Sequence, residues 1–368
     1  MENPSAESAR VRYRVKLAAL LVVGLSTLLS GCASPVASAP NPLSSVTPSP
    51  TGTPNSVVSF SNFEFVSVQG TGQIFTYNLS TGVQVLAGPP YATPCSDPSG
   101  MVVTTIAGSN IMAVVCYDTN SLLTLSINAN GSLTALGSVA GLPVPYPGIV
   151  LDGTNVFVPL LGSASVNGAV AKVSIASPAT PAIIAEVTLA SPPSGGTSNA
   201  GYLAVSNGYI YATAGSEANP ELTSSTIQVV NDATMTLVGS PLVVPHSPQQ
   251  LAIQGNDLYV TLFDATELES FDISNPASPF PLEIVSAAPA NQACHPLPIA
   301  VTNSSAYIGC YSEGIVEQFN IGNPAAMQLQ ASIAGIANPQ RLALSGDLLL
   351  ITGASTGGQV YQLNLSEW

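Results

Sequence analysis

The 368-residue chain repeats a short pattern seven times after its first 56 residues. Each copy has a short apolar segment, a tight turn and a second apolar segment, as in 251–253, 255–257 and 258–260. The copies start 43 to 53 residues apart, at Val57, Met101, Ile149, Tyr202, Leu251, Ile299 and Leu342. A period of this length, built only from strand patterns, is typical of a β-propeller, in which each blade is a four-stranded sheet.

No segment shows the 3.6-residue apolar periodicity of a helix, so we predict an all-β, seven-bladed propeller over residues 57–368. We expect the propeller to be a monomer. The last copy has 27 residues and stops after a third strand, 358–366, which matches 72–80 of the first copy. We therefore expect an N-terminal strand within about 44–60 to complete the last blade. Such closure removes exposed sheet edges.

Residues 1–31 have the layout of a secretory signal peptide: basic residues, an apolar stretch at 17–29 and then small residues. The stretch is shorter than the ~20 apolar residues that span a bilayer. Leu-Ser-Gly-Cys at 29–32 resembles the lipobox of bacterial lipoproteins, which implies cleavage before Cys32 and a lipid on its sulfur. An ordinary signal peptide with an incidental cysteine is the alternative.

The lipobox resemblance implies an anchor at Cys32 in a lipid bilayer of the bacterial cell envelope. Ala33 follows the cysteine. Because Asp at that position favours the inner membrane in enteric-type bacteria, we expect the outer membrane or cell surface. Residues 33–56 contain six Pro, six Ser and no charge, so we expect 32–56 to be a disordered linker.

Only 7% of the residues are charged, against roughly 25% in ordinary soluble domains. Beyond the signal peptide, two cations, Lys172 and Arg341, stand against 18 carboxylates. Two scattered cations do not supply the phosphate contacts that DNA or RNA requires, so nucleic acid is excluded as a partner. A phosphorylated substrate is disfavoured for the same reason. The acidic surface also suggests that the protein faces an acidic or otherwise harsh exterior.

Besides Cys32, the chain has two cysteines in the second copy and two in the sixth. In each copy one cysteine precedes the first strand and the other ends the second strand. Four cysteines allow three pairings. Since these copies are not neighbours in a seven-membered ring, we predict the disulfides Cys95–Cys116 and Cys294–Cys310, which suit an exported protein. A site in which all four thiolates bind a metal is the alternative, but CxxC spacing is missing.

In a propeller, the loops before the first strands and those after the second strands form a ligand-binding rim. Both histidines of the chain, His246 and His295, lie in equivalent loops of adjacent copies. Carboxylates in such loops include Asp118, Asp264, Glu267 and Glu313. Two imidazoles and a carboxylate could bind a metal or supply acid–base catalysis on a lactone or ester. Ordinary loop roles account for the same spacing.

Asp264, Glu267, Glu269 and Asp272 form the densest acidic run, which could hold Ca²⁺. The run lacks the spacing and the turn glycine of a calcium loop, so a solvated acidic strand edge is the simpler interpretation. We expect no cofactor.

The segment FDISNPASP at 271–279 resembles the LVIVD-repeat propellers of bacterial surface proteins, with weaker copies at 173–178 and 319–324. NPQRLAL at 338–344 resembles the YVTN and lactonase-like propellers. The resemblance covers about 57–368. It implies a seven-bladed propeller and, for function, a surface protein, a binding module or an enzyme.

Two functions follow from these observations. The favoured one is a lipoprotein whose propeller rim binds a protein, a glycan or a small ligand. The alternative is a lactonase-like hydrolase that uses His246 or His295 together with Arg341 at the rim. The favoured function needs no catalytic set, and the sequence shows none.

Overall fold

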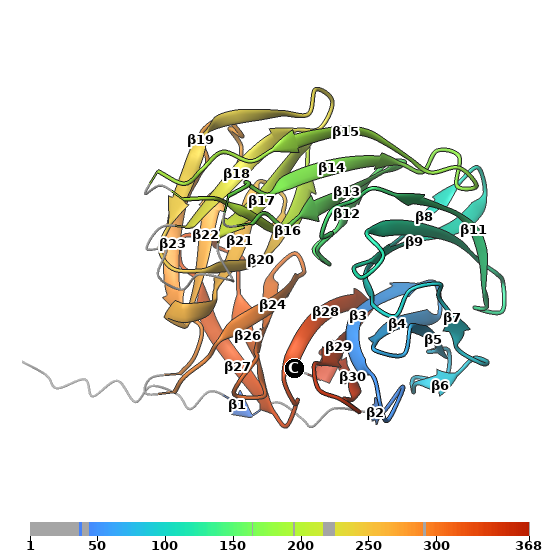
Figure 1. Cartoon of the computed structure of the whole chain (residues 1–368). Helices are drawn as coiled ribbons and strands as arrows, with labels where there is room; N and C mark the ends of the chain where they lie inside the picture. Colours follow the sequence, from blue (N-terminus) through green and yellow to red (C-terminus); the bar gives the residue numbers. More distant parts are fainter. Residues whose placement is uncertain are drawn as a thin grey trace, which may run out of the picture. The chain divides into compact units, whose positions relative to one another are not determined.

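The computed structural model describes residues 37–38, 44–163, 165–193, 196–215, 225–289 and 292–367. Seven sheets form a ring (Figure 1). The predicted signal peptide and Cys32 lie outside the described residues. The helices of the described part are two short 3-10 turns, η1 (Phe263–Ala265) and η2 (Leu365–Glu367). The predicted all-β, seven-bladed propeller is confirmed.

Among the described residues, no helix has the length and apolar character to cross a bilayer.

Each blade is an antiparallel sheet whose first strand lies nearest the centre of the ring (Figure 1). From blade 1 to blade 7, the first strands are β3 (Thr53–Phe60), β8 (Pro98–Ile106), β12 (Val150–Asp152), β16 (Asn199–Ser206), β20 (Pro248–Gln254), β24 (Pro296–Val301) and β28 (Pro339–Ser345). The second strands are β4 (Phe63–Gln69), β9 (Ser109–Cys116), β13 (Asn155–Leu160), β17 (Tyr209–Gly215), β21 (Asp257–Leu262), β25 (Ser305–Cys310) and β29 (Leu348–Gly353). First strands contact each other from blade to blade, and β28 contacts β3, so the ring is closed.

The outer half of each blade has a third and a fourth strand. The third strands are β5 (Gln73–Asn78), β10 (Ser121–Ile127), β14 (Ala169–Ser174), β18 (Ser225–Asn231), β22 (Glu267–Asp272), β26 (Ile315–Asn320) and β30 (Val360–Asn364). The fourth strands of blades 1 to 6 are β6 (Val85–Leu86) with β7 (Tyr91–Ala92), β11 (Leu133–Ala140), β15 (Ala182–Thr188), β19 (Thr236–Val244), β23 (Phe280–Ser286) and β27 (Gln328–Ala334).

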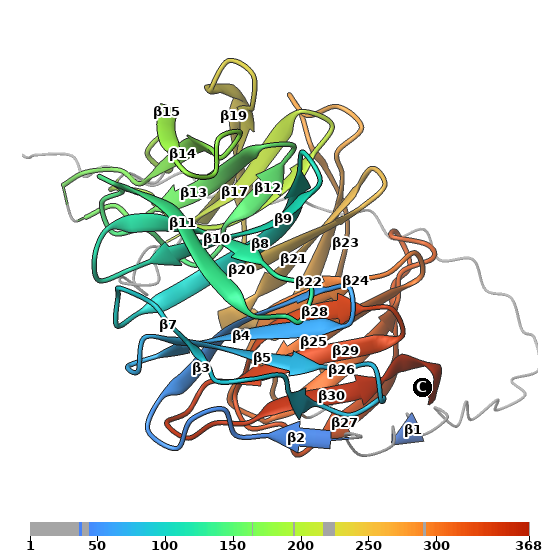
Figure 2. The ribbon, with the colours of Figure 1, turned by 90° about the vertical axis from the view of Figure 1, so that its right-hand side faces the viewer.

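Blade 7 takes its fourth strand from the N-terminal side of the chain. β2 (Ser44–Val46) pairs antiparallel with β30, as seen from the side in Figure 2. This pairing confirms the predicted closure. β1 (Ala37–Ser38) pairs in parallel with β27 of blade 6. The segment 32–56, predicted to be disordered, is therefore ordered in part, because its backbone groups find partners on strand edges that would otherwise be unpaired.

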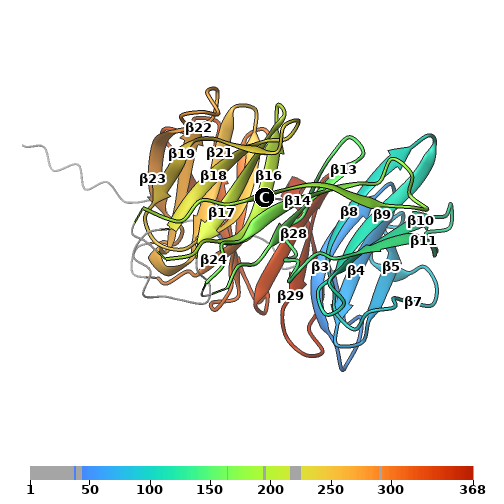
Figure 3. The same ribbon diagram turned by 45° about the horizontal axis from the view of Figure 1, so that its top comes forward.

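The apolar core is divided among the seven interfaces between neighbouring blades, where the sheets lie face to face (Figure 3). In β21, Leu258 and Val260 pack toward blade 4, whereas Tyr259 packs toward blade 6. Since inner strands are covered on both faces, they read as continuous apolar runs rather than as apolar and polar residues in alternation.

Six of the first strands carry a β-bulge near their start. A hydroxyl on the second strand binds the bulge in three blades. In blade 5, Thr261 Oγ1 accepts a hydrogen bond from the Gln250 N–H at 3.1 Å and donates to the Leu297 carbonyl of blade 6 at 2.9 Å. Ser67 makes the equivalent two bonds from blade 1 to blade 2, and Thr213 binds the bulge of blade 4. We call Ser67, Thr213 and Thr261 the bulge hydroxyls.

Three glutamates, Glu64, Glu269 and Glu317, are buried in the blades. Burial raises the pKa of Glu64 to about 7, although a hydrogen bond of 2.7 Å from Gln84 Nε2 opposes the shift. Burial also raises the pKa of Glu317 to about 7. The pKa of Glu269 rises to about 7 through burial and the neighbouring charge of Glu267. All three side chains are therefore largely neutral near pH 5.

We predict that stability falls as the pH rises from 5 to 8. Between the ordinary glutamate pKa of 4.5 and the folded value of about 7, the folded chain binds more protons than the unfolded chain. The stabilisation is complete below 4.5 and is lost as the pH passes through 7. Thermal unfolding should show a lower Tm at pH 8 than at pH 5. Glu64→Gln should flatten this dependence, and Glu186→Gln, at an exposed position on β15, should not. A Tm that rises from pH 5 to pH 8 would contradict the prediction.

The bulge hydroxyls generate a second prediction. Thr261→Val leaves the Gln250 N–H and the Leu297 carbonyl without their partner and should lower the free energy of unfolding by about 1–3 kcal/mol. Thr352 holds the same place in blade 7, and its buried hydroxyl has no partner in the described part of the chain. Thr352→Val should therefore be neutral or stabilising. Urea unfolding of both variants tests the difference, and equal costs would refute it.

Candidate functional site

The loops before the first strands and the loops between the second and third strands lie on one face of the ring, which we call the rim face. Antiparallel pairing puts the start of a first strand next to the end of a second strand. The predicted site residues all lie on or beside this face: Asp118, His246, Asp264, Glu267, His295, Glu313 and Arg341. The structure brings only some of them together.

His295 and Glu313 are in direct contact in blade 6. His295 Nδ1 lies 2.7 Å from Glu313 Oε1, and the backbone N–H of His295 donates to Glu313 Oε2 at 2.9 Å. Partial burial favours the neutral acid, but these bonds outweigh it and hold the pKa of Glu313 below its usual value. The ring of His295 also packs against Phe263, with centroids 5.2 Å apart. Its side chain remains 42% exposed, so the imidazole is oriented but accessible.

Blade 2 repeats this arrangement with other residues. The backbone N–H and the hydroxyl of Ser96 donate to Asp118 Oδ2 at 2.9 and 2.7 Å. These bonds hold the pKa of Asp118 below its usual value, against the effect of its slight burial. The predicted disulfides Cys95–Cys116 and Cys294–Cys310 are confirmed. Each ties one of these loops to the end of a second strand. We call residues 95–97 and 294–296 the clamped loops.

The other candidates are not assembled into a metal site. His246 is exposed, with φ of 63° between two prolines. Asp264 is exposed on η1, and Asp272 accepts a hydrogen bond from the Ser274 N–H. Over the described ranges, no three His, Cys, Asp or Glu side chains are placed to hold a metal ion.

Arg341 belongs to a second group, at the centre of the ring. Its Cζ lies 4.8 Å from the centroid of the Tyr202 ring, and its Nη1 donates to the Tyr202 hydroxyl at 3.2 Å. The two residues come from blades 7 and 4, which are not neighbours. Tyr146 packs edge-on against Tyr202, and Gln250 Nε2 donates to the Gln340 carbonyl at 2.9 Å. Contacts between such distant blades are possible only at the centre.

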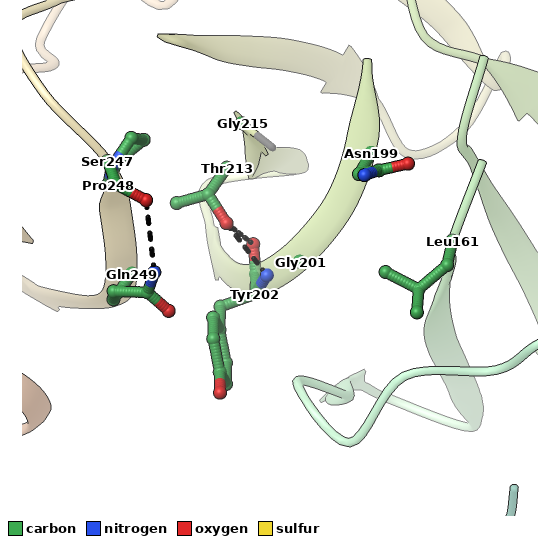
Figure 4. Close-up of a pocket in the computed structure, with 9 residues that line it drawn as sticks. All are labelled: Leu161, Asn199, Gly201, Tyr202, Thr213, Gly215, Ser247, Pro248 and Gln249. Atoms are coloured by element: carbon green, nitrogen blue, oxygen red, sulfur yellow. Dashed lines mark hydrogen bonds between the residues drawn. The ribbon is translucent and has the colours of Figure 1, made fainter. Parts of the chain in front are cut away.

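We call this group, together with Gln249, the central cluster. Figure 4 shows Gln249 beside Tyr202, in a small pocket that Asn199 and Ser247 also line. Arg341 was predicted as a site residue from the sequence, but its neighbours in the central cluster were not. A signal was present, because Pro-Gln-Gln at 248–250 and Pro-Gln-Arg at 339–341 occupy the same bulge position in two blades.

The clamped loops generate a prediction about stability. Cys294→Ala with Cys310→Ala should lower the free energy of unfolding by about 3 kcal/mol, since the disulfide closes a loop with a sequence separation of 16. Cys95→Ala with Cys116→Ala should cost a similar amount, because the separation there is 21. Urea unfolding under non-reducing conditions measures both losses. A loss below about 1 kcal/mol in both pairs would contradict the loop-entropy argument.

Solved structures resemble this fold at low sequence identity. Virginiamycin B lyase from Staphylococcus aureus has 13% identity and a TM-score of 0.62, over 88% of this chain and 98% of that one. A functionally unknown protein from Desulfotomaculum acetoxidans has 15% identity and a TM-score of 0.64, over 83% and 93%. BamB from Moraxella catarrhalis has 13% identity and a TM-score of 0.51, over 85% of each chain. No family model and no curated protein matches the chain. These likenesses support the propeller fold alone.

Proposed function

We propose that the chain is a lipid-anchored protein of the bacterial cell envelope, at the outer membrane or cell surface, whose propeller binds a partner on the rim face. The partner is a protein, a glycan or a small ligand. The basic and apolar leader followed by Leu-Ser-Gly-Cys at 29–32 supports the anchor. The repeats at 271–279 and 338–344 support a place among LVIVD- and YVTN-type propellers.

The observation that carries the binding function is the pair of clamped loops. Each is held by a disulfide and by a carboxylate that accepts a backbone N–H. Tyr117, whose N–H donates to the Asp97 carbonyl of the first clamped loop, is 39% exposed, and the side chain of His295, within the second, is 42% exposed. A ring that is exposed and already fixed in place, as that of His295 is by Glu313 and Phe263, loses little conformational entropy on binding. Rigid loops on a closed scaffold are typical of binding sites.

The anchor is tested with Cys32→Ser. In a bacterial host fed an alkyne fatty acid, the unmutated chain should incorporate the label and partition with membranes. Cys32→Ser should do neither. Labelled or membrane-bound Cys32→Ser protein would refute the anchor and leave the rim proposal standing.

Partner binding is tested by site-specific photo-crosslinking in intact cells of the source bacterium. A photoreactive amino acid at position 117 should give a discrete adduct that excess purified protein competes away. The same amino acid at Leu237, on β19 of the outer wall, is a matched control, because Leu237 is 37% exposed and Tyr117 is 39% exposed. Equal adducts from both positions, or none from position 117, would refute a rim partner.

One contact favours the alternative, a lactonase-like hydrolase. A histidine held through Nδ1 by a carboxylate, as His295 is by Glu313, is the arrangement of a general base. In the described part of the chain, Arg341 binds Tyr202 rather than either histidine. Only the contact between His295 and Glu313 therefore supports this function. Lactone hydrolysis by the unmutated protein that is lost in His295→Ala would establish it. No turnover by the unmutated protein would exclude it for the lactones tested.

A further inference from the structure

Arg341 is a buried cation that has no counter-ion among the described residues. Its side chain is on β28 just after the bulge, and the residue is 8% exposed. The one ion pair within 4.0 Å in the described part of the chain joins His295 and Glu313, so no carboxylate there neutralises the guanidinium. Burial of an unpaired charge is costly, and the Tyr202 ring compensates it only in part. The chain keeps this cost although it has 18 carboxylates beyond its signal peptide.

The central cluster also contains buried hydrogen-bonding atoms that have no partner in the part of the chain that the structure describes. Nη1 of Arg341 donates to Tyr202 and to the Gln340 carbonyl, but Nη2 is buried without a partner. The side-chain oxygens of Gln249 and Gln340 are buried without partners as well. Gln249 is 4% exposed and lines the pocket beside Tyr202 (Figure 4). Buried polar atoms are normally paired, so a free donor and two free acceptors in one cluster indicate a missing group.

The bulges explain how these side chains come to the centre. Gln249 and Gln340 both lie in bulges of first strands, and a bulge turns a side chain away from its normal place in the sheet. Thr213 fixes the equivalent bulge of blade 4 by accepting the Tyr202 N–H at 2.8 Å. The positions of the unsatisfied atoms are therefore built into the backbone of blades 5 and 7, and the bulge of blade 4 positions the Tyr202 ring that Arg341 contacts.

We propose that the central cluster binds a small monocarboxylate that also carries a hydroxyl or N–H donor. The carboxylate accepts from Nη2 of Arg341, and the donor group binds the side-chain oxygen of Gln249. Guanidinium and carboxylate are geometrically complementary, and one cation neutralises one negative charge. A dianion or trianion would bring surplus charge into a protein that is already strongly acidic. This inference rests on the proposed role of the propeller as a binding module, and it does not require the lipid anchor.

The test uses the purified protein and four probes: lactate, acetate, lactamide and inorganic phosphate. Lactate should bind saturably in calorimetry and raise Tm. Acetate, which lacks the donor, should bind at least about tenfold more weakly, and lactamide, which lacks the charge, should not bind. No saturable binding of lactate or acetate would overturn the proposal, since water would then satisfy the cluster. Phosphate binding as tight as that of lactate would overturn the assigned class.

Substitutions test which side chains of the central cluster bind lactate. Arg341→Gln should abolish lactate binding. Lys172→Gln removes the other cation, whose Nζ donates to the Asp232 carbonyl, and should bind lactate normally. Equal losses in both variants, or none in Arg341→Gln, would overturn the proposal. If Arg341→Gln does not fold, Gln249→Leu keeps the cation and should weaken lactate at least about tenfold while leaving acetate unchanged. Unchanged lactate binding by Gln249→Leu would overturn the assigned contact.

The experiments distinguish a failure of the proposed rim partner from a failure of the proposed carboxylate site in the central cluster. Replacement of Tyr117 or His295 by Ala should leave lactate binding intact, because neither residue belongs to the central cluster. Loss of the adduct at position 117 with retained lactate binding refutes only the rim partner. A retained adduct without lactate binding refutes only the central site.

Discussion

The ring depends on the contact between each blade and the next, because one four-stranded blade has two apolar faces and covers neither by itself. The structure meets this constraint with seven interface cores and with hydrogen bonds at the bulges of the first strands. Thr261 shows how the two are joined, since one hydroxyl binds the bulge of its own blade and the carbonyl of the next. In the last blade, β2 pairs with the outer edge of β30, which would otherwise be unpaired.

The bulges also connect the fold to the candidate sites. A regular first strand would direct its side chains toward the neighbouring blades. A bulge changes the direction of the side chains at and next to it, so Tyr202, in the bulge of blade 4, contacts Arg341, just after the bulge of blade 7. The clamped loops lie just before two of these first strands. The clamped loops belong to blades 2 and 6, whereas the bulges of the central cluster belong to blades 4, 5 and 7. A disulfide fixes each clamped loop, and backbone pairing fixes each bulge.

The parts of the fold that could be predicted from sequence are those that repeat along the chain and those for which the number and order of the blades leave one arrangement. The repeat spacing gave seven blades, the incomplete last copy implied an N-terminal strand, and the separation of blades 2 and 6 selected the disulfides. The contact between Arg341 and Tyr202 could not be predicted, because the residues are 139 positions apart and no sequence motif links them. The contact between His295 and Glu313 required the loop geometry that the disulfide imposes. The composition of the linker did not predict that Ser44–Val46 forms a strand. This segment pairs because the edge of β30 is available to it, and composition does not reveal such an edge.

The few charges of this chain are placed in two different ways. Exposed carboxylates such as Asp118 are used as acceptors for loop backbones, where ionisation strengthens the bond. Glu64 and Glu317 are buried where the neutral acid is favoured, so ionisation weakens the fold. Arg341 cannot follow this second route, because a guanidinium does not lose its proton in a protein. A buried carboxyl group reduces its desolvation cost by taking up a proton. A buried guanidinium reduces this cost only by pairing with an anion. In the described part of the chain, no carboxylate lies within 4.0 Å of the Arg341 guanidinium.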